Sequence, residues 1–299
     1  PPRSTLFPYT TLFRSDKWLR KRKAGTVHAC LEATGLYGDD IALFLHEAGH
    51  TVSVVNPARI KAYGDSRLQR NKTDRLDAAL IAEFCLTQHP AAWTPPDPAW
   101  RELRALARRV FDVQDMRQQE LNRRAAGLVS DAVSQALDAH IAFLQQQLEA
   151  LYQQIRDHLD HHPDLKQQCD LLDSIPGLGP LSAMLLVAEL GDLRRFEHAG
   201  QVVAFAGLNP RQRRSGSSVH GATPLSKTGH AALRRILYFP AISARHHNPL
   251  IAPWCDQLAA RHKAKKQIIG AAMRKLLVLA YGVLKSGQPF DPAYSLAAP

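Results

Sequence analysis

Three carboxylates in the first third of the chain have the residue types and the setting of a metal site. Asp74 and Asp77 lie three residues apart, at the start of an apolar-periodic run that predicts a helix, so they share one helix face. Glu32 lies in residues 26–34, whose apolar and β-branched content predicts a buried strand. Carboxylate oxygens are the ligands that Mg²⁺ prefers. The alternative is a solvated first helical turn, where acidic residues interact well with the helix dipole.

A serine in the last third of the chain is the second candidate for chemistry. Ser226 precedes Lys227 at the start of residues 226–239, which we predict to form a helix ended by Pro240. A serine there is a good N-cap, and the same environment stabilises an attacking alkoxide and a bound phosphate. The rival serines 215, 217 and 218 lie in a glycine-containing loop, without a predicted helix end to orient them.

Two blocks of sequence resemble one family, the DEDD-type insertion-sequence transposases, which are RuvC-like recombinases guided by a bridge RNA. The first block is Leu-Glu-Ala-Thr-Gly at 31–35, Val-Val-Asn-Pro-Ala-Arg at 54–59 and Lys-Thr-Asp-Arg-Leu-Asp-Ala at 72–78. The second is Ala-Gly-Leu-Asn-Pro at 206–210, the arginine-rich loop after it, and Leu-Ser-Lys-x-Gly-x-x-x-x-Arg from 225. The resemblance implies that Glu32, Asp74 and Asp77 bind Mg²⁺ with a further aspartate from a first strand. It also implies that Ser226 is the nucleophile that becomes joined to DNA.

The start of the sequence departs from this family. The family begins with a strand that carries Gly-x-Asp-x-Ser/Ala-Lys, and this sequence has no match to it. Residues 1–15 resemble translated adaptor read-through and lack the regions of a signal peptide, so we interpret them as an artefactual leader. We therefore expect a truncated RuvC-like domain over residues 16–90, with a metal site that lacks one ligand.

The predicted organisation is an α/β N-terminal domain, a helical linker and a mainly α C-terminal domain. Strands at 26–34 and 51–55 alternate with helices at 38–48 and 74–88, which predicts a parallel α/β layer. The family resemblance implies that this layer is of RuvC-like (RNase H-like) type. Prolines at 90–98 mark a break before a helical linker over residues 91–165. The C-terminal domain is expected over residues 166–285, with a loose tail at 286–299.

A heptad-like repeat runs through the second half of the linker. Apolar residues recur at spacings of mostly four and three, at Leu137, Ile141, Leu144, Leu148, Leu151, Ile155 and Leu159. The repeat is compatible with a helical hairpin that packs on itself and with a coiled coil between subunits.

The C-terminal third contains the whole excess of positive charge. Residues 201–299 hold fourteen lysines and arginines against two aspartates, a net of +12, while the whole chain carries +11. Charge concentrated in this way predicts a phosphate-rich partner, and a merely soluble basic surface is the alternative.

Particular residues of the C-terminal domain are candidates for binding DNA. Pro-Gly-Leu-Gly at 176–179 lies between two predicted helices and resembles a helix-hairpin-helix, whose glycines let backbone N–H groups approach a phosphate; a plain tight turn is the alternative. The candidate DNA-binding residues are Gly177, Gly179, Arg211, Arg213, Arg214, Lys227, Arg234 and Arg235.

Other classes of protein fit the sequence less well. Four cysteines lie far apart with no Cys-x-x-Cys pair, which argues against a disulfide framework and fits a reducing cytoplasm. His46-Glu47-Ala48-Gly49-His50 matches a zinc-peptidase pattern, but Gly49 is expected to end the helix before His50. No run approaches eighteen apolar residues, so we expect no membrane span.

The predicted function is Mg²⁺-dependent DNA transposition through a phosphoserine link. Expected partners are element-end and target DNA, a guide RNA and further copies of the chain as a dimer or tetramer. Two alternatives remain open: a RuvC-like nuclease that uses a metal-bound water, and a DNA-binding protein without catalytic activity.

Overall fold

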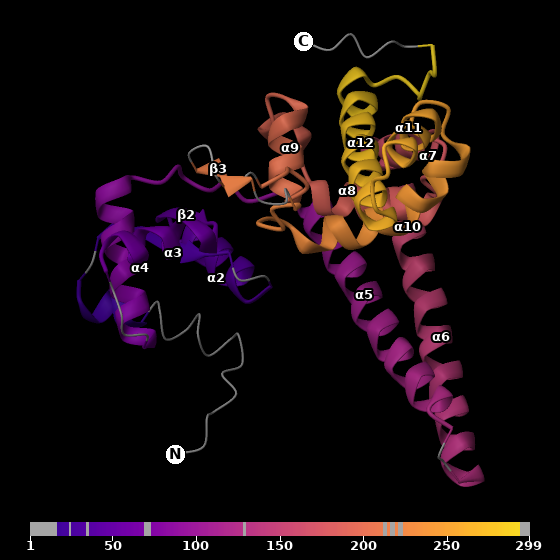
Figure 1. Cartoon of the computed structure of the whole chain (residues 1–299). Helices are drawn as coiled ribbons and strands as arrows, with labels where there is room; N and C mark the ends of the chain where they lie inside the picture. Colours follow the sequence, from indigo (N-terminus) through magenta and orange to yellow (C-terminus); the bar gives the residue numbers. More distant parts are fainter. Residues whose placement is uncertain are drawn as a thin grey trace. The chain divides into compact units, whose positions relative to one another are not determined.

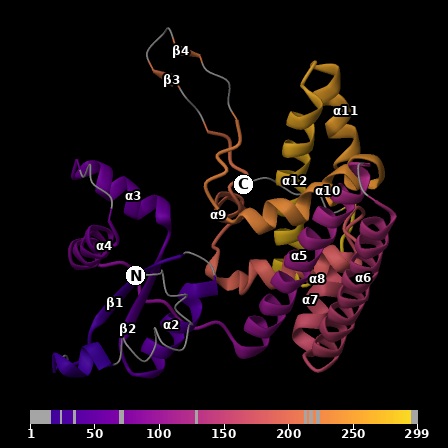
Figure 2. The same ribbon diagram turned by 90° about the horizontal axis from the view of Figure 1, so that it is seen from below.

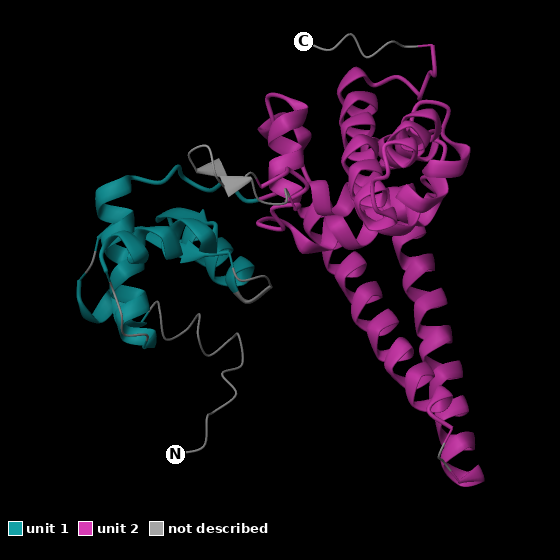
Figure 3. Cartoon of the chain, viewed as in Figure 1, with its two compact units in different colours: residues 1–95 teal, residues 96–299 magenta. Residues whose placement is uncertain are grey.

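The structure is a computed structural model, and it divides the chain into two compact units. The units comprise residues 1–95 and 96–299, and the division falls within the proline-rich segment (Figure 3). The residues that the structure describes are 17–23, 25–33, 36–68, 73–127, 130–211, 214–215, 219–220 and 224–293. The predicted leader, residues 1–15, lies outside them.

The first unit is built on a two-stranded parallel sheet with helices packed on it. The predicted parallel pairing is confirmed: His28 is opposite Thr51 and Glu32 is opposite Val55. Parallel neighbours need a crossover connection, and the helix between these strands provides it. The described elements in this unit are β1 (His28–Glu32), α2 (Leu36–Glu47), β2 (Thr51–Val55), α3 (Pro57–Ser66) and α4 (Asp74–Gln88).

Helix α3 was not predicted from the sequence, because Pro57 was interpreted only as the end of a strand. Asn56 caps the helix, since its side chain accepts a hydrogen bond of 2.8 Å from the Ala58 N–H, and Pro57 occupies the first helical turn.

The expected end of α2 is confirmed. Gly49 has φ +83° and His50 lies beyond the helix, so the zinc-peptidase pattern lacks the continuous helix that it requires.

A long antiparallel pair of helices begins the second unit. α5 (Pro98–Ala125) and α6 (Asp131–Asp160) pack side by side, joined by a short connection (Figures 1 and 2). Leu144, Leu148, Ile155 and Leu159 of the predicted repeat are buried. The repeat therefore forms a hairpin within one chain.

The rest of the second unit is a helical core built around its last helix. α12 (Lys265–Ser286) contains the fully buried Leu276, Leu277 and Ala280 and packs against α7, α9, α10 and α11. By length and composition α12 could cross a membrane, but 56% of its apolar stretch is buried, as in a core helix. The other described elements are α7 (Pro163–Asp173), α8 (Pro180–Leu190), η1 (Leu193–Arg195), α9 (Ala199–Ala206), β3 (Arg214–Ser215), β4 (Val219–His220), α10 (Ala231–His247) and α11 (Ala252–Ala260).

The predicted end of a helix at Pro240 is wrong. α10 continues to His247 with Pro240 buried inside it. Burial of Leu237 and Ala241 on either side of the proline outweighs the lost backbone hydrogen bond.

The loose tail expected over residues 286–299 stays a prediction. Within its described part, the Phe290 N–H donates to Ser174 Oγ at 2.8 Å.

The turn between α7 and α8 contains the two glycines of the predicted helix-hairpin-helix. Gly177 has φ +107°, and an added Cβ there would lie 2.6 Å from Ala244 Cβ on α10. Gly179 has φ −104°, and a Cβ there would meet nothing within 4 Å. Packing thus requires glycine at 177 but not at 179. DNA binding by this turn stays a prediction.

We expect Gly177→Ala to destabilise the second unit by roughly 2 kcal/mol or more, because it combines a left-handed backbone with a steric clash. Gly179→Ala is the matched control, with an expected change below about 1 kcal/mol. Denaturant unfolding of the full chain measures both. Equal stability of the two variants would contradict the packing role of Gly177.

Candidate active site

The three candidate carboxylates lie on two elements of the first unit. Glu32 is half-buried at the end of β1. Asp74 and Asp77 occupy the first turn of α4, where Asp74 is exposed and Asp77 is half-buried. Thr73 fixes the start of this helix, because its hydroxyl accepts a hydrogen bond of 3.3 Å from the Leu76 N–H.

Helix α4 packs on β1, the strand that carries Glu32. The Cys85 Sγ of α4 lies 3.9 Å from the His28 carbonyl oxygen at the start of β1. Cys30, further along the strand, packs against the apolar cluster that contains Leu80 and Phe84 of α4. The elements that carry the three candidate carboxylates are therefore in contact.

No three His, Cys, Asp or Glu side chains gather closely enough to hold a metal ion within the part of the chain that the structure describes. The donor set of Glu32, Asp74 and Asp77 consists of carboxylate oxygens only, which fits a hard divalent cation in chemical type. The metal site stays a prediction.

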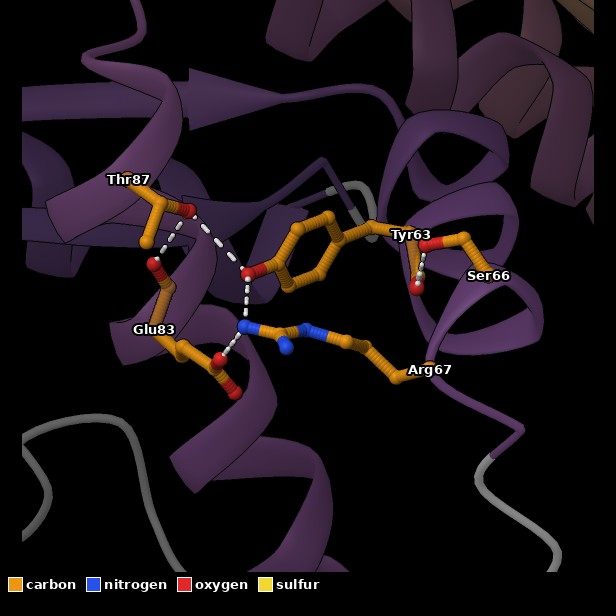
Figure 4. Close-up of polar contacts among 5 residues, drawn as sticks. All are labelled: Tyr63, Ser66, Arg67, Glu83 and Thr87. Atoms are coloured by element: carbon orange, nitrogen blue, oxygen red, sulfur yellow. Dashed lines mark hydrogen bonds and ion pairs between the residues drawn. The ribbon is translucent and has the colours of Figure 1, made fainter.

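A polar network holds α4 against α3 (Figure 4). Tyr63 Oη lies 3.1 Å from Thr87 Oγ1, and Arg67 donates to Tyr63 Oη at 3.2 Å. Arg67 also forms an ion pair with Glu83. The Tyr63 ring packs edge-on against Phe84, with 5.4 Å between ring centroids. These contacts fix the orientation of the helix whose first turn carries Asp74 and Asp77.

Ser226 is not at a helix N-terminus, and this prediction is wrong. α10 begins at Ala231, and His230 is its N-cap residue. Ser226 instead lies in an extended segment, half-buried, four residues before that cap. A helix cannot form over 226–230 because the backbone there is paired with another segment, residues 205–211.

This pairing determines the position of the Ser226 hydroxyl. Its Oγ donates to Asn209 Oδ1 at 2.6 Å, and the Ser226 N–H donates to the Asn209 carbonyl oxygen at 2.8 Å. On one side, the Arg211 N–H donates to the Pro224 carbonyl oxygen at 2.8 Å. On the other, the Lys227 N–H donates to the Gly207 carbonyl oxygen at 3.1 Å. Sequence reasoning missed Asn209, although it lies within the family-like block at 206–210.

The paired segment is tightly packed and conformationally constrained. Lys227 has φ +53°, a left-handed conformation that costs a residue with a side chain on the order of 1 kcal/mol and persists only where the surroundings enforce it. A Cβ at Gly229 would lie 2.4 Å from the Phe205 carbonyl oxygen, so only glycine permits this approach. Strain of this kind concentrates at functional sites.

The predicted phosphate-binding arginines have different environments. Arg234 Nη1 donates to the carbonyl oxygens of Ala206 and Gly229 at 2.9 and 3.1 Å, so it clamps the paired segment. Arg235 forms a bidentate pair with Asp115, with both distances 2.7 Å. Arg211 and Lys227 are exposed. Their contacts with DNA stay predictions.

Arg213, Ser217 and Ser218 lie outside the described residues, and Arg214 and Ser215 are described only as backbone in β3.

A buried ion pair that sequence reasoning missed lies beside this segment. Glu189, on the otherwise apolar α8, has a side chain with no exposed area, and its Oε2 lies 3.1 Å from His230 Nε2. Its Oε1 lies 3.4 Å from Arg108 Nε on α5. The sequence signal was a glutamate within an apolar helix. Such a residue indicates a buried charge, and a buried charge requires partners elsewhere in the chain.

Comparisons with known proteins define the class of this chain as DNA transposases. The family model described as "Transposase IS116/IS110/IS902 family" matches residues 169–254, and a second model, the DEDD transposase of IS110 type, matches residues 11–130. The chain is 33% identical to the pilin gene-inverting proteins of Moraxella bovis and Moraxella lacunata over 267 residues, 89% of this chain and 82% of each relative. It is 24% identical to the transposase for insertion sequence element IS1328 of Yersinia enterocolitica, over 84% of this chain and 82% of the relative.

The chain belongs to the IS110/IS116 family of DEDD transposases. It is therefore an enzyme of the transposase and recombinase class, and its family implies that it acts on DNA. The predicted family and class of reaction are confirmed.

The stability of the second unit is expected to depend on the charge of Glu189. Burial by itself would raise the pKa of this carboxyl, but the hydrogen bond and charge of His230, with the charges of Arg108 and Arg104, lower it below its ordinary value. A lowered pKa gives stability that is complete above the unfolded value, about 4.3, and is lost as the pH falls through the folded value.

We therefore expect the stability advantage of the wild type over Glu189→Gln to be full at neutral pH and to shrink below about pH 4. Denaturant unfolding at a series of pH values measures it. Glu102→Gln, at an exposed position on α5, is the control and should match the wild type throughout. A pH-independent difference between the wild type and Glu189→Gln would contradict this account.

Proposed function

We propose that this chain cuts and rejoins DNA by a Mg²⁺-dependent reaction in which Ser226 becomes covalently joined to DNA. The single observation that supports it is the position of the Ser226 hydroxyl, fixed by Asn209 within a strained, packed segment. The family membership supplies the substrate class. Target choice lies with a structured RNA, and the acting form contains more than one copy of the chain.

The attachment step exchanges one phosphoester bond for another. Ser226 Oγ attacks a DNA phosphorus and loses its proton, a bond from phosphorus to Oγ forms, and the bond to one bridging oxygen of the DNA breaks. The departing oxygen takes up a proton and leaves as a hydroxyl. The Asn209 amide oxygen accepts a hydrogen bond from the serine O–H and so orients it. An amide oxygen is too weak a base to hold the proton that the serine loses. Energy of the broken bond is retained in the phosphoserine, so the strand can be rejoined without a cofactor such as ATP.

Glu32, Asp74 and Asp77 would hold Mg²⁺, which offsets negative charge on the transferring phosphate. The packing of α4 on β1 supports this assignment, because the two elements that carry these carboxylates are in contact. Both elements that carry these carboxylates belong to the first unit, whereas Ser226 belongs to the second. In this proposal each unit therefore supplies one part of the active site.

Exposed basic side chains of the second unit support nucleic-acid binding. They neutralise phosphates, and their number predicts strong salt dependence. The exposed residues of this kind near Ser226 and at the start of α12 are Arg211, Lys227, Arg261, Lys263, Lys265, Lys266 and Arg274. Lys275 is different, since its Nζ donates to the Leu250 carbonyl oxygen at 3.0 Å and lies over the Trp254 ring.

The proposed nucleophile is tested by trapping the covalent product. With labelled element-end DNA, guide RNA and Mg²⁺, we expect a denaturation-resistant adduct with the wild type and a loss of 10³-fold or more, roughly, with Ser226→Ala. Thr228→Ala is the matched control, because Thr228 is a nearby exposed hydroxyl. Strand cleavage that survives Ser226→Ala without an adduct would instead identify a nuclease that uses water.

The proposed metal ligands are tested by amide substitutions. We expect Asp77→Asn and Glu32→Gln each to lower Mg²⁺-dependent cleavage by on the order of 10²-fold or more, since each removes a charged ligand. Asp65→Asn is the control, at an exposed carboxylate on α3 in the same unit. Cleavage by Asp77→Asn at the rate of Asp65→Asn would show that these carboxylates do not hold the metal.

A further inference from the structure

The paired segment that carries Ser226 is bonded to residues 205–211 at several points, and two of them, at Ser226 and at His230, involve side chains as well as backbone. At the first, Asn209 holds the hydroxyl. At the second, the His230 N–H donates to the Phe205 carbonyl oxygen at 2.7 Å, and the His230 ring lies 5.3 Å from the Phe205 ring, centroid to centroid. Between them the Lys227 N–H donates to the Gly207 carbonyl oxygen, and the Lys227 backbone is left-handed. Ser226 and His230 therefore belong to one continuous bonded segment.

His230 is held from below by the buried carboxylate of Glu189. The Glu189 side chain has no exposed area, and His230 Nε2 lies 3.1 Å from its Oε2. The same carboxylate faces Arg108 of α5 at 3.4 Å. Glu189 thus links three parts of the unit: the α5–α6 hairpin, helix α8, and the start of α10 next to the Ser226 segment.

Stability alone does not account for this pair. Apolar residues of similar volume in place of a buried ion pair are often neutral or stabilising, because the cost of desolvating charges offsets their attraction. A buried polar pair does constrain position, since each side chain is held at a short distance from its partner, here 3.1 Å from His230 Nε2 to Glu189 Oε2. Here the contact holds His230, which lies at the end of the segment that carries Ser226.

We propose that Glu189 and His230 are positioning residues for the Ser226 hydroxyl. They keep residues 226–230 in register with 205–209, so that the hydroxyl stays at one position relative to the incoming phosphate. Neither residue touches DNA in this proposal, and both act through the backbone between His230 and Ser226. The inference rests on the proposed role of Ser226 as nucleophile. It assigns a function to Glu189, outside the family-like blocks, and to His230, at an unspecified position of the motif that begins at residue 225.

Two substitutions at His230 separate this role from a general structural one. His230→Gln can place its amide nitrogen near the position of Nε2 and keep the contact with Glu189. His230→Asn places its amide nearer to the position of Nδ1 and cannot reach Glu189. We expect His230→Asn to slow single-turnover attachment of DNA to Ser226 by on the order of 10- to 100-fold, because the reacting hydroxyl is misplaced. The attachment rate of His230→Gln should lie within about threefold of the wild-type rate. DNA affinity should stay within about twofold for both, because neither side chain contacts DNA in this proposal.

Hydrogen exchange gives a readout that does not depend on activity. In His230→Asn we expect at least tenfold faster exchange, roughly, at the amides of Lys227 and His230, which are bonded to Gly207 and Phe205. The amide of Asn248, bonded to Ala244 at the far end of α10, reports whether the fold is intact and should not change. If His230→Asn loses protection at Asn248, Glu189→Gln replaces it as the test variant.

The two hypotheses fail in different ways. Absence of any adduct with the wild type overturns the nucleophile role of Ser226, and the exchange data still decide whether Glu189 and His230 hold the segment. Unchanged protection at Lys227 and His230 in His230→Asn, or equal attachment rates for His230→Asn and His230→Gln, overturns the positioning role.

Discussion

The pairing of residues 205–211 with residues 224–230 is the constraint on which the candidate active site depends. Backbone hydrogen bonds join the two segments at Arg211, Ser226, Lys227 and His230, and the Ser226 hydroxyl adds a side-chain bond to Asn209. Each of these bonds is modest by itself, about 1 kcal/mol. Together they enforce a left-handed Lys227 and a close approach at Gly229 that a free loop would not adopt. The serine is thereby held in one place before any substrate is bound.

The helical core supports this pairing from beneath. α12 is largely buried along one side and packs against α9 and α10, the two helices that flank the paired segments. Arg234, on the first turn of α10, reaches back to carbonyl oxygens on both segments, so a positive charge neutralises the backbone dipoles that converge there. From α8, the Glu189 carboxylate contacts the His230 side chain at the end of the same segment. Cationic side chains of this unit therefore divide into those that hold the protein together and those that remain exposed for a phosphate.

The first unit carries the candidate carboxylates on two separate elements, β1 and α4, that pack on one another. The two strands pair in parallel, and the network of Tyr63, Arg67, Glu83 and Thr87 connects α4 to α3. Much of this unit was predictable, because strands, helix caps and apolar periodicity are local properties of the sequence. Helix α3 was missed because a proline after a strand signals both the end of that strand and the first turn of a helix.

The sequence by itself determined the family, the parallel strands, the acidic first turn of α4, the heptad-like repeat and the concentration of basic charge. These depend on residue type and on spacing over a few turns. Tertiary structure alone decided that Ser226 lies in a paired segment and that Pro240 lies inside a helix. It also decided that Arg234 and Arg235 bond within the protein and that Glu189 reaches His230. The physical reason is that a guanidinium, a hydroxyl or a carboxylate has the same local sequence whether its partner is a phosphate or a group of the protein. Which partner it finds depends on residues brought together from distant parts of the chain.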